Sequence, residues 1–153
     1  MFTFILGADK KFAFSPFCPF SQMKTIFKIG DTKIFERTAR NEDTAFFESG
    51  EVHAVYATFA LTRDAEWCSR LFVLDMKDEN EEGIGTFVEV KHLSPALVGD
   101  TVIFKAVIDE LRGNVINCSF TASVGNRLIA EGRTGQKILT RSKLEQLFSE
   151  LKK

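Results

Sequence analysis

The stretch ALTRDAEWCSRLFVLDM, residues 60–76, decides which fold this chain is expected to adopt. It lies inside the longest part of the chain that contains neither Gly nor Pro. Its apolar residues recur at the spacing of one face of an α-helix, with Leu61, Ala65, Cys68 and Phe72 on one stripe and Trp67 and Leu71 beside it. We therefore expect a helix over Ala60–Met76 that buries this stripe, with Trp67 in the core.

After this helix, the pattern changes to an alternation of apolar and polar residues, which is the period of a β-strand. The acidic run Asp78–Gly83 is expected to be a solvated loop without a chemical role. Turn-forming residues then separate four expected strands, at Ile84–His92, Thr101–Leu111, Val115–Val124 and Arg127–Leu139. An amphipathic helix is expected over Ser142–Lys153.

Before the helix, Lys24–Thr38 is rich in Ile, Phe and Thr and predicts one or two short strands. Asn41–Val55 has mixed polarity and predicts a loop or a short helical piece over the core. A strand, a long helix and four antiparallel strands indicate an α+β fold, with one antiparallel sheet wrapped around one central helix. This is the outline of the hot-dog fold.

At 153 residues, the chain is long enough for one domain with its own core. We expect residues 23–153 to be that domain. Residues 1–22 hold six phenylalanines and are expected to be a peripheral extension, with an apolar arm that docks on a neighbouring subunit as the alternative. The apolar run Met1–Leu6 is too short for a signal-peptide core or a bilayer span, so no membrane association is expected.

The composition, 44% hydrophobic and 27% charged with a formal net charge of −1, is that of an ordinary soluble globular protein. A nucleic-acid partner is not expected, because such a partner usually requires a clustered basic face. Cys18, Cys68 and Cys118 lie far apart and form no CxxC pair. This pattern favours free thiols in the cytoplasm over a disulfide frame or a zinc site.

Three residues carry the chemistry that the sequence suggests, namely Thr58, Glu66 and His92. A hydroxyl can orient reactants through hydrogen bonds, a carboxylate can act as a base, and an imidazole can transfer protons. Hydrolysis needs groups of these three kinds. Burial beside Ala65 and Trp67 would disfavour the charged form of Glu66 and make it a better base. We expect Thr58 within hydrogen-bonding reach of Glu66, directly or through one water, beside a pocket that His92 also faces.

Each of these residues also has a purely structural interpretation. Glu66 has the helical spacing to pair with a neighbouring arginine on the surface. Thr58 could be only the N-cap of the helix, and His92 an ordinary histidine at the end of a strand. His53, the only other histidine, is a further candidate for the mouth of a pocket.

From Thr32 to about Leu139, the chain resembles the fluoroacetyl-CoA thioesterase-like branch of the hot-dog superfamily. The matching motifs are Tyr56-Ala57-Thr58, then Glu66-Trp67 eight positions on, and Gly83-Ile84-Gly85 leading into a strand that ends in His92. Pro95 and Gly99 follow in the next loop.

The resemblance implies an enzyme that hydrolyses a short or medium acyl-CoA thioester without a metal or other cofactor. It implies that Thr58, Glu66 and His92 are catalytic, with Glu66 activating a water or attacking the carbonyl directly. The backbone N–H of Gly85 would polarise the thioester carbonyl, since glycine permits close approach of the backbone to a ligand. It also implies a homodimer or higher homo-oligomer with the site at or near the subunit boundary.

The sequence departs from the family pattern in two places. Residues Phe46–His53 stand where the fluoroacetate-specific enzymes have a lid, and Gln136 stands where a well-known member of the family has an arginine in its last strand. We therefore expect thioesterase chemistry on an acyl group other than fluoroacetyl. Two other functions stay open, a non-catalytic acyl-CoA-binding protein and an acyl-CoA hydratase or dehydratase.

Overall fold

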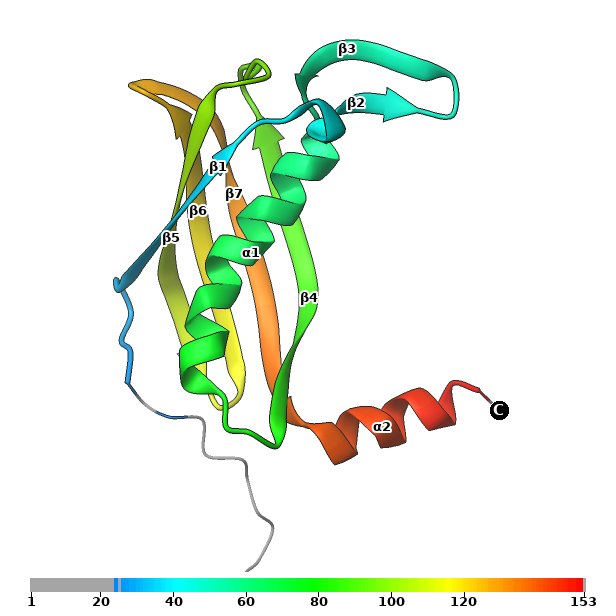
Figure 1. Ribbon diagram of the computed structural model, residues 1–153. Coiled ribbons are helices and arrows are strands. Elements are labelled where there is room, and N and C mark those ends of the chain that lie inside the picture. Colours follow the sequence, from blue (N-terminus) through cyan, green and yellow to red (C-terminus); the bar gives the residue numbers. More distant parts are fainter. Residues whose placement is uncertain (1–23, 25, 153) are drawn as a thin grey trace, which may run out of the picture.

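The computed structural model describes residue 24 and residues 26–152 (Figure 1). The chain forms β1 (Thr32–Thr38), the 3-10 helix η1 (Asn41–Asp43), β2 (Thr44–Phe47), β3 (Gly50–Tyr56), α1 (Thr58–Met76), β4 (Glu81–His92), β5 (Thr101–Arg112), β6 (Val115–Val124), β7 (Arg127–Thr140) and α2 (Arg141–Glu150). The Phe-rich segment 1–22, its expected role and Cys18 lie outside the described residues.

Five of the strands form one antiparallel sheet in the order β1-β5-β6-β7-β4, and α1 packs along one face of it (Figure 1). The interface is the core of the molecule, to which α1 contributes Ala60, Leu61, Ala65, Cys68, Phe72, Val73 and Met76. α2 buries only Leu144, so α1 is the more buried of the two helices, as predicted. The α+β architecture with one central helix is therefore confirmed, and it is the hot-dog fold.

The stripe predicted on α1 is fully buried, since Leu61, Ala65, Cys68 and Phe72 are all 0% exposed. Trp67 is not a core residue, because its side chain is 41% exposed. Residue 67 lies about 100° around the helix from Cys68, which turns it away from the sheet.

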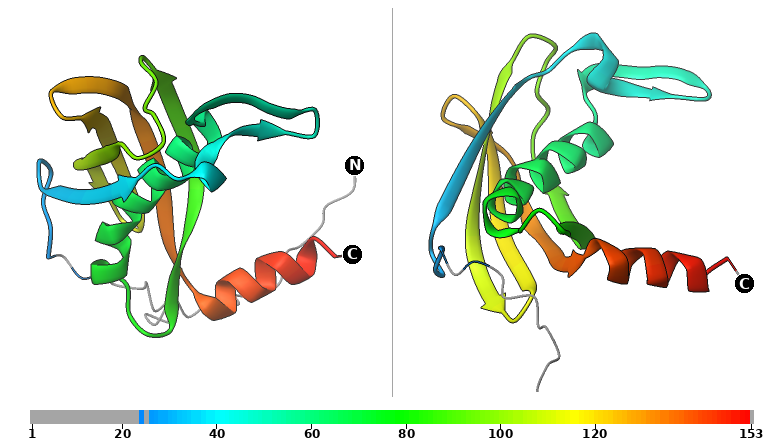
Figure 2. Two further views of the ribbon diagram at one scale, coloured as in Figure 1. Left: turned by 45° about the horizontal axis from the view of Figure 1, so that its top comes forward. Right: turned by 60° about the horizontal axis from the view of Figure 1, so that its bottom comes forward.

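The prediction of a loop or short helical piece over Asn41–Val55 was largely wrong. Only η1 is helical, and β2 pairs with β3 in a hairpin in which Phe47 lies opposite Gly50. Gly50 has a φ of +102°, a conformation that glycine adopts without the steric cost of a side chain, and it allows the tight reversal. Figure 2 shows that this hairpin and α2 both project from the body on the side of β4.

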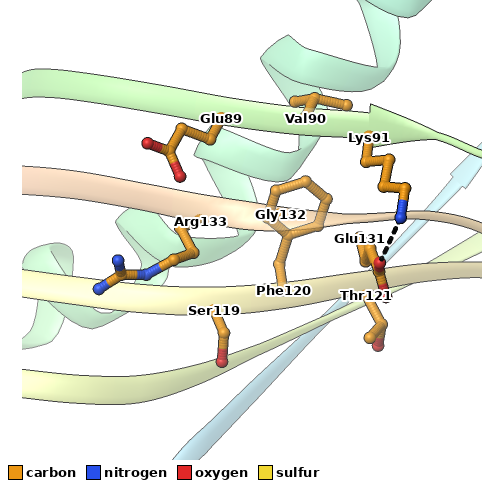
Figure 3. Close-up of a pocket in the computed structure, with 9 residues that line it drawn as sticks. All are labelled: Glu89, Val90, Lys91, Ser119, Phe120, Thr121, Glu131, Gly132 and Arg133. Carbon is orange, nitrogen blue, oxygen red and sulfur yellow. Dashed lines mark ion pairs between the residues drawn. The ribbon is translucent and has the colours of Figure 1, made fainter.

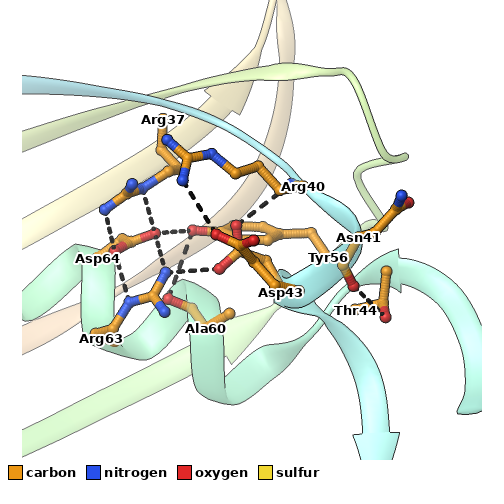
Figure 4. Close-up of polar contacts among 10 residues, drawn as sticks. Arg37, Arg40, Asn41, Asp43, Thr44, Tyr56, Ala60, Arg63 and Asp64 are labelled. Carbon is orange, nitrogen blue, oxygen red and sulfur yellow. Dashed lines mark hydrogen bonds and ion pairs between the residues drawn. The ribbon is translucent and has the colours of Figure 1, made fainter.

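A buried polar network ties the start of α1 to β1 and β3 (Figure 4). Asp64, which is 1% exposed, accepts hydrogen bonds from Arg37 on β1 at 3.1 Å and from Arg63 at 2.9 Å. The Tyr56 hydroxyl donates to the same carboxylate at 2.6 Å. Arg63 also pairs with Asp43 of η1 at 2.8 Å. The network thus fixes where α1 begins relative to the strand that precedes it.

The acidic run after α1 is an exposed loop only over residues 78–80, because Glu81 and Glu82 already open β4. Glu81 is 2% exposed, and Glu82 accepts ion pairs from Arg70, Lys77 and Arg141. Among residues 24 and 26–152, no helix combines the length and the apolar character needed to cross a membrane.

Candidate active site

Thr58 and His92 meet where the first turn of α1 reaches the end of β4. Thr58 Oγ1 and His92 Nδ1 are 2.9 Å apart, a hydrogen bond whose donor depends on the imidazole tautomer. The N-cap of α1 is Ala57, so Thr58 is not the N-cap, and its hydroxyl is directed to His92 instead. His92 Nε2 is buried and has no partner in the described part of the chain.

The pair lines a pocket of about 400 Å³ between the β2–β3 hairpin and the loop after β4. His53 of β3 and Ser94 also line it, which places His53 where the sequence suggested it. The pocket therefore gathers two imidazoles and two hydroxyls around an opening large enough for part of a small molecule.

Glu66 lies against β4 at a second place, two turns further along α1. A Cβ built on Gly85 would be 2.5 Å from Glu66 Oε1, so the carboxylate occupies the space that a side chain would fill. Glu66 is half-buried and forms no ion pair with any described residue. The expected alternative, surface pairing with Arg63 or Arg70, is absent because these arginines pair with other carboxylates.

A bulge in β4 puts Gly85 and His92 on the same face of the sheet. The pairing of β4 with β7 shifts between Gly85 and Phe87, so Thr86 is an extra residue with no partner. Side chains alternate between the two faces of a sheet along a strand. Without the extra residue, the odd position of Gly85 and the even position of His92 would therefore face opposite sides of the sheet. Gly85 faces Glu66 and His92 faces Thr58, and both contacts are with α1. Because of the bulge, both Gly85 and His92 face α1.

One chain does not bring all three predicted residues together. Thr58 and Glu66 are eight residues apart on one helix, a rise of roughly 12 Å, so neither a direct hydrogen bond nor a single water can join them. Glu66 lines a separate pocket of about 240 Å³ with Arg37, Arg63, Asp64, Trp67 and Arg70. The site in one chain is thus two halves, Thr58–His92 and Glu66–Gly85.

Two polar residues on the inner face of β7 were not predicted as site residues. Gln136 and Thr134 are each 1% exposed, and Gln136 Oε1, Gln136 Nε2 and Thr134 Oγ1 have no hydrogen-bond partner in the described part of the chain. Gln136 is the register partner of Gly85. The alternation of the strand could have predicted that both residues lie on the core face. It could not have shown that they lack hydrogen-bond partners within the described part of the chain.

A third opening, of about 480 Å³, lies on the sheet among β4, β6 and β7 (Figure 3). Its lining includes charged residues such as Lys91 and Glu131, which are 3.7 Å apart. It contains none of the predicted site residues. No group of three or more His, Cys, Asp or Glu is placed to hold a metal ion within the residues that the structure describes.

The sequence of residues 39–142 matches the model of the family described as fluoroacetyl-CoA-specific thioesterase, FlK. The chain belongs to the FlK family. No curated protein sequence matched the chain. Membership in the FlK family supports acyl-CoA thioesterase activity in general, because this is the chemistry for which the family is named.

Solved structures agree with the FlK family assignment. A Thermus thermophilus protein described as a thioesterase superfamily member is 38% identical, with a TM-score of 0.78 over 82% of this chain and 93% of that chain. A mutant of FlK itself is 18% identical, with a TM-score of 0.75 over 81% of this chain and 96% of that chain. A hot-dog-like protein from Thermanaerovibrio acidaminovorans is 22% identical, with a TM-score of 0.73 over 81% and 92%. The last two similarities show the shared fold.

Proposed function

We propose that this protein is an acyl-CoA thioesterase in which Glu66, Thr58 and His92 act on the thioester. The observation that carries the proposal is the half-buried Glu66 carboxylate, held without an ion pair against the bare Cα of Gly85. FlK has been solved with fluoroacetate and CoA, which supports a CoA thioester as the ligand class of the family.

Hydrolysis needs a nucleophile at the thioester carbonyl carbon and a proton for the departing sulfur. In our proposal, Glu66 removes a proton from a water whose oxygen bonds to that carbon, or its carboxylate attacks the carbon directly to give an anhydride that water opens. The N–H of Gly85 donates to the carbonyl oxygen as it gains negative charge. The C–S bond then breaks, and His92, held through Nδ1 by Thr58, stabilises the thiolate or supplies its proton.

A second copy of the chain would bring the two halves together. In the described part of the chain, β4 is an edge of the sheet, and such edges commonly pair with another strand. If β4 pairs antiparallel with β4 of a second copy about a two-fold axis between Val88 and Glu89, His92 of one chain lies opposite Gly85 of the other. We therefore propose a homodimer in which Glu66 of one chain and the Thr58–His92 pair of the other face one thioester.

The test is Glu66→Gln, which keeps the size of the side chain and removes the base. Release of free CoA from a panel of acyl-CoAs should fall by roughly two to four orders of magnitude, while acyl-CoA binding persists. Glu145→Gln on the exposed face of α2 is the matched control and should leave the rate unchanged.

The assay also separates the two other functions, because neither hydration nor mere binding releases CoA. A thiol dye detects the released CoA, and the two buried cysteines of the core add little background. Burial raises the pKa of Cys68 to about 11 and that of Cys118 to about 12, and both thiols therefore stay protonated and unreactive in the folded protein. Undiminished release by Glu66→Gln would contradict the proposed role of this residue.

A further inference from the structure

The inner face of β7 carries two polar side chains whose hydrogen-bonding capacity is unused within the described residues. Gln136 can donate through Nε2 and accept through Oε1, and Thr134 can do both through Oγ1, yet none of these buried atoms has a partner there. Burying such a group without a partner is energetically unfavourable. Groups of this kind in native structures are commonly satisfied by a ligand or an ordered water.

Gln136 lies next to the half of the site that contains Glu66. A Cβ built on Gly83 would be 3.4 Å from Gln136 Oε1, and one built on Gly85 would be 2.5 Å from Glu66 Oε1. The amide and the carboxylate therefore lie over two glycines of the same strand. Gly85 is exposed and Gln136 is buried on the next strand, so a group that enters beside Gly85 meets Glu66 first and Gln136 behind it.

The distance between strands indicates which part of an acyl group would reach Gln136. Neighbouring strands lie about 4.8 Å apart. A thioester carbonyl held at the N–H of Gly85 therefore places a substituent near the third carbon of the acyl chain within reach of the amide on β7.

The charges around Gln136 restrict that substituent to a neutral one. Arg70 Nη1, like Gln136 Oε1, would be 3.4 Å from a Cβ built on Gly83, but Nη1 donates to the carbonyl of Gly83 at 3.2 Å and Nη2 pairs with Glu82 at 2.7 Å. An acyl group with its own carboxylate would face Glu66 without a free cation to balance it. An unsubstituted alkyl chain would leave the amide of Gln136 without a partner.

We propose that Gln136 selects acyl-CoAs whose acyl group carries a neutral hydroxyl or carbonyl near the third carbon, with Thr134 as a second hydrogen-bonding group. This inference rests on the proposed thioesterase function. A site built to hydrogen-bond such a substituent discriminates strongly against the analogue that lacks it, because its own polar groups are then left unpaired.

The experiment compares kcat/KM for CoA release from butyryl-CoA, 3-hydroxybutyryl-CoA and acetoacetyl-CoA, which share one chain length. The native protein should favour the two substituted substrates by at least tenfold. Gln136→Met, which has a similar length without the amide, should reduce that preference by roughly ten- to a hundredfold. Thr134→Val should reduce it by less, and Gln146→Met on the exposed surface of α2 should leave it unchanged.

The possible failures are distinguishable. If the native protein prefers butyryl-CoA, the inference is wrong whether or not Gln136→Met folds. The inference is also wrong if Gln136→Met keeps its thermal transition and loses kcat/KM equally on all three substrates. Either result leaves the thioesterase function standing, because CoA is still released. No release from any acyl-CoA by the native protein would overturn the thioesterase function and this inference with it.

Discussion

The carboxylate of Glu66 occupies the space beside Gly85 that the Cβ of any other residue would fill. Gly85 is not strained, since its φ lies outside the left-handed range. The position requires glycine because of what lies opposite it, as a Cβ would be 2.5 Å from Oε1. Close approach between backbone and a functional carboxylate is one of the reasons for a glycine inside a strand.

Gly85→Ala should therefore displace Glu66 and reduce the rate of CoA release by roughly tenfold to a hundredfold, because small misplacements of a catalytic group have effects of this size. The double variant Gly85→Ala with Glu66→Gln should be no slower than Glu66→Gln alone, since the added methyl group acts only through the carboxylate. Additive losses in kcat/KM would show instead that the methyl group acts on something other than the carboxylate, since alanine keeps the backbone N–H.

At the scale of elements, the Asp64 network fixes the position of α1 against β1 and β3. Burial alone would raise the pKa of Asp64, but hydrogen bonds from Arg63, Tyr56 and Arg37 outweigh it and hold the pKa below the ordinary value of 3.8. Burial, together with the hydrogen bond to Asp64, raises the pKa of the Tyr56 phenol. The network is therefore intact at neutral pH, with Asp64 ionised and Tyr56 protonated.

Because the folded-state pKa of Asp64 is lowered, its contribution to stability is present above the unfolded pKa and is lost as the pH falls through the folded pKa. Asp64→Asn should lower the free energy of unfolding at pH 7 by about 1–3 kcal/mol and flatten its decline below about pH 4. The control is Asp75→Asn, whose partly exposed ion pair with Lys33 should contribute at most about 1 kcal/mol. Urea unfolding from pH 3 to pH 7 measures both, and an unchanged slope in Asp64→Asn would contradict the assignment.

At the scale of the whole molecule, the arrangement around β4 points to a second copy. Within the residues that the structure describes, β4 is an edge strand of the sheet, and it lies between two projecting elements, the β2–β3 hairpin and α2 (Figure 2). Both expose large apolar side chains, including Phe46 at 64%, Phe47 at 53% and Phe148 at 48%. Apolar surface of this kind around an unpaired sheet edge is typical of an interface between subunits.

Light scattering at micromolar concentration should therefore give a mass of at least twice the 17.2 kDa of one chain. Phe148→Glu in α2 together with Leu151→Glu at its C-cap removes apolar surface without touching the core or the candidate catalytic residues, and should shift the equilibrium toward smaller species. A monomeric native protein that hydrolyses acyl-CoA at full rate would contradict the shared site.

The domain boundary proposed at residue 23 is testable at the same scale. Phe27 already packs on the core, with its ring centroid 5.1 Å from that of Phe72. Removal of residues 1–22 should leave the thermal transition, the mass in solution and the rate of CoA release nearly unchanged. Loss of the assembled state alone would support the alternative of an apolar arm.

The sequence by itself was sufficient for most elements because helical and strand periodicities are local. The stripe on residues 60–76 predicted the central helix, and alternation predicted Val115–Val124 with the bounds that the structure has. Resemblance at Tyr56-Ala57-Thr58, Glu66 and His92 indicated the family, which the match over residues 39–142 shows. The β2–β3 hairpin was missed, although Gly50 and the alternation after it carried a weak signal.

Only the tertiary structure decided which side chains meet. The extra residue Thr86 sets the face of β4 on which Gly85 and His92 lie, and it is visible only in the pairing with β7. The separation of Thr58–His92 from Glu66–Gly85 likewise depends on contacts between residues far apart in the chain, and so does the lack of a partner for the amide of Gln136 among the described residues. Local pattern determines what each segment becomes, whereas register and packing, which sum over the whole chain, determine what each segment faces.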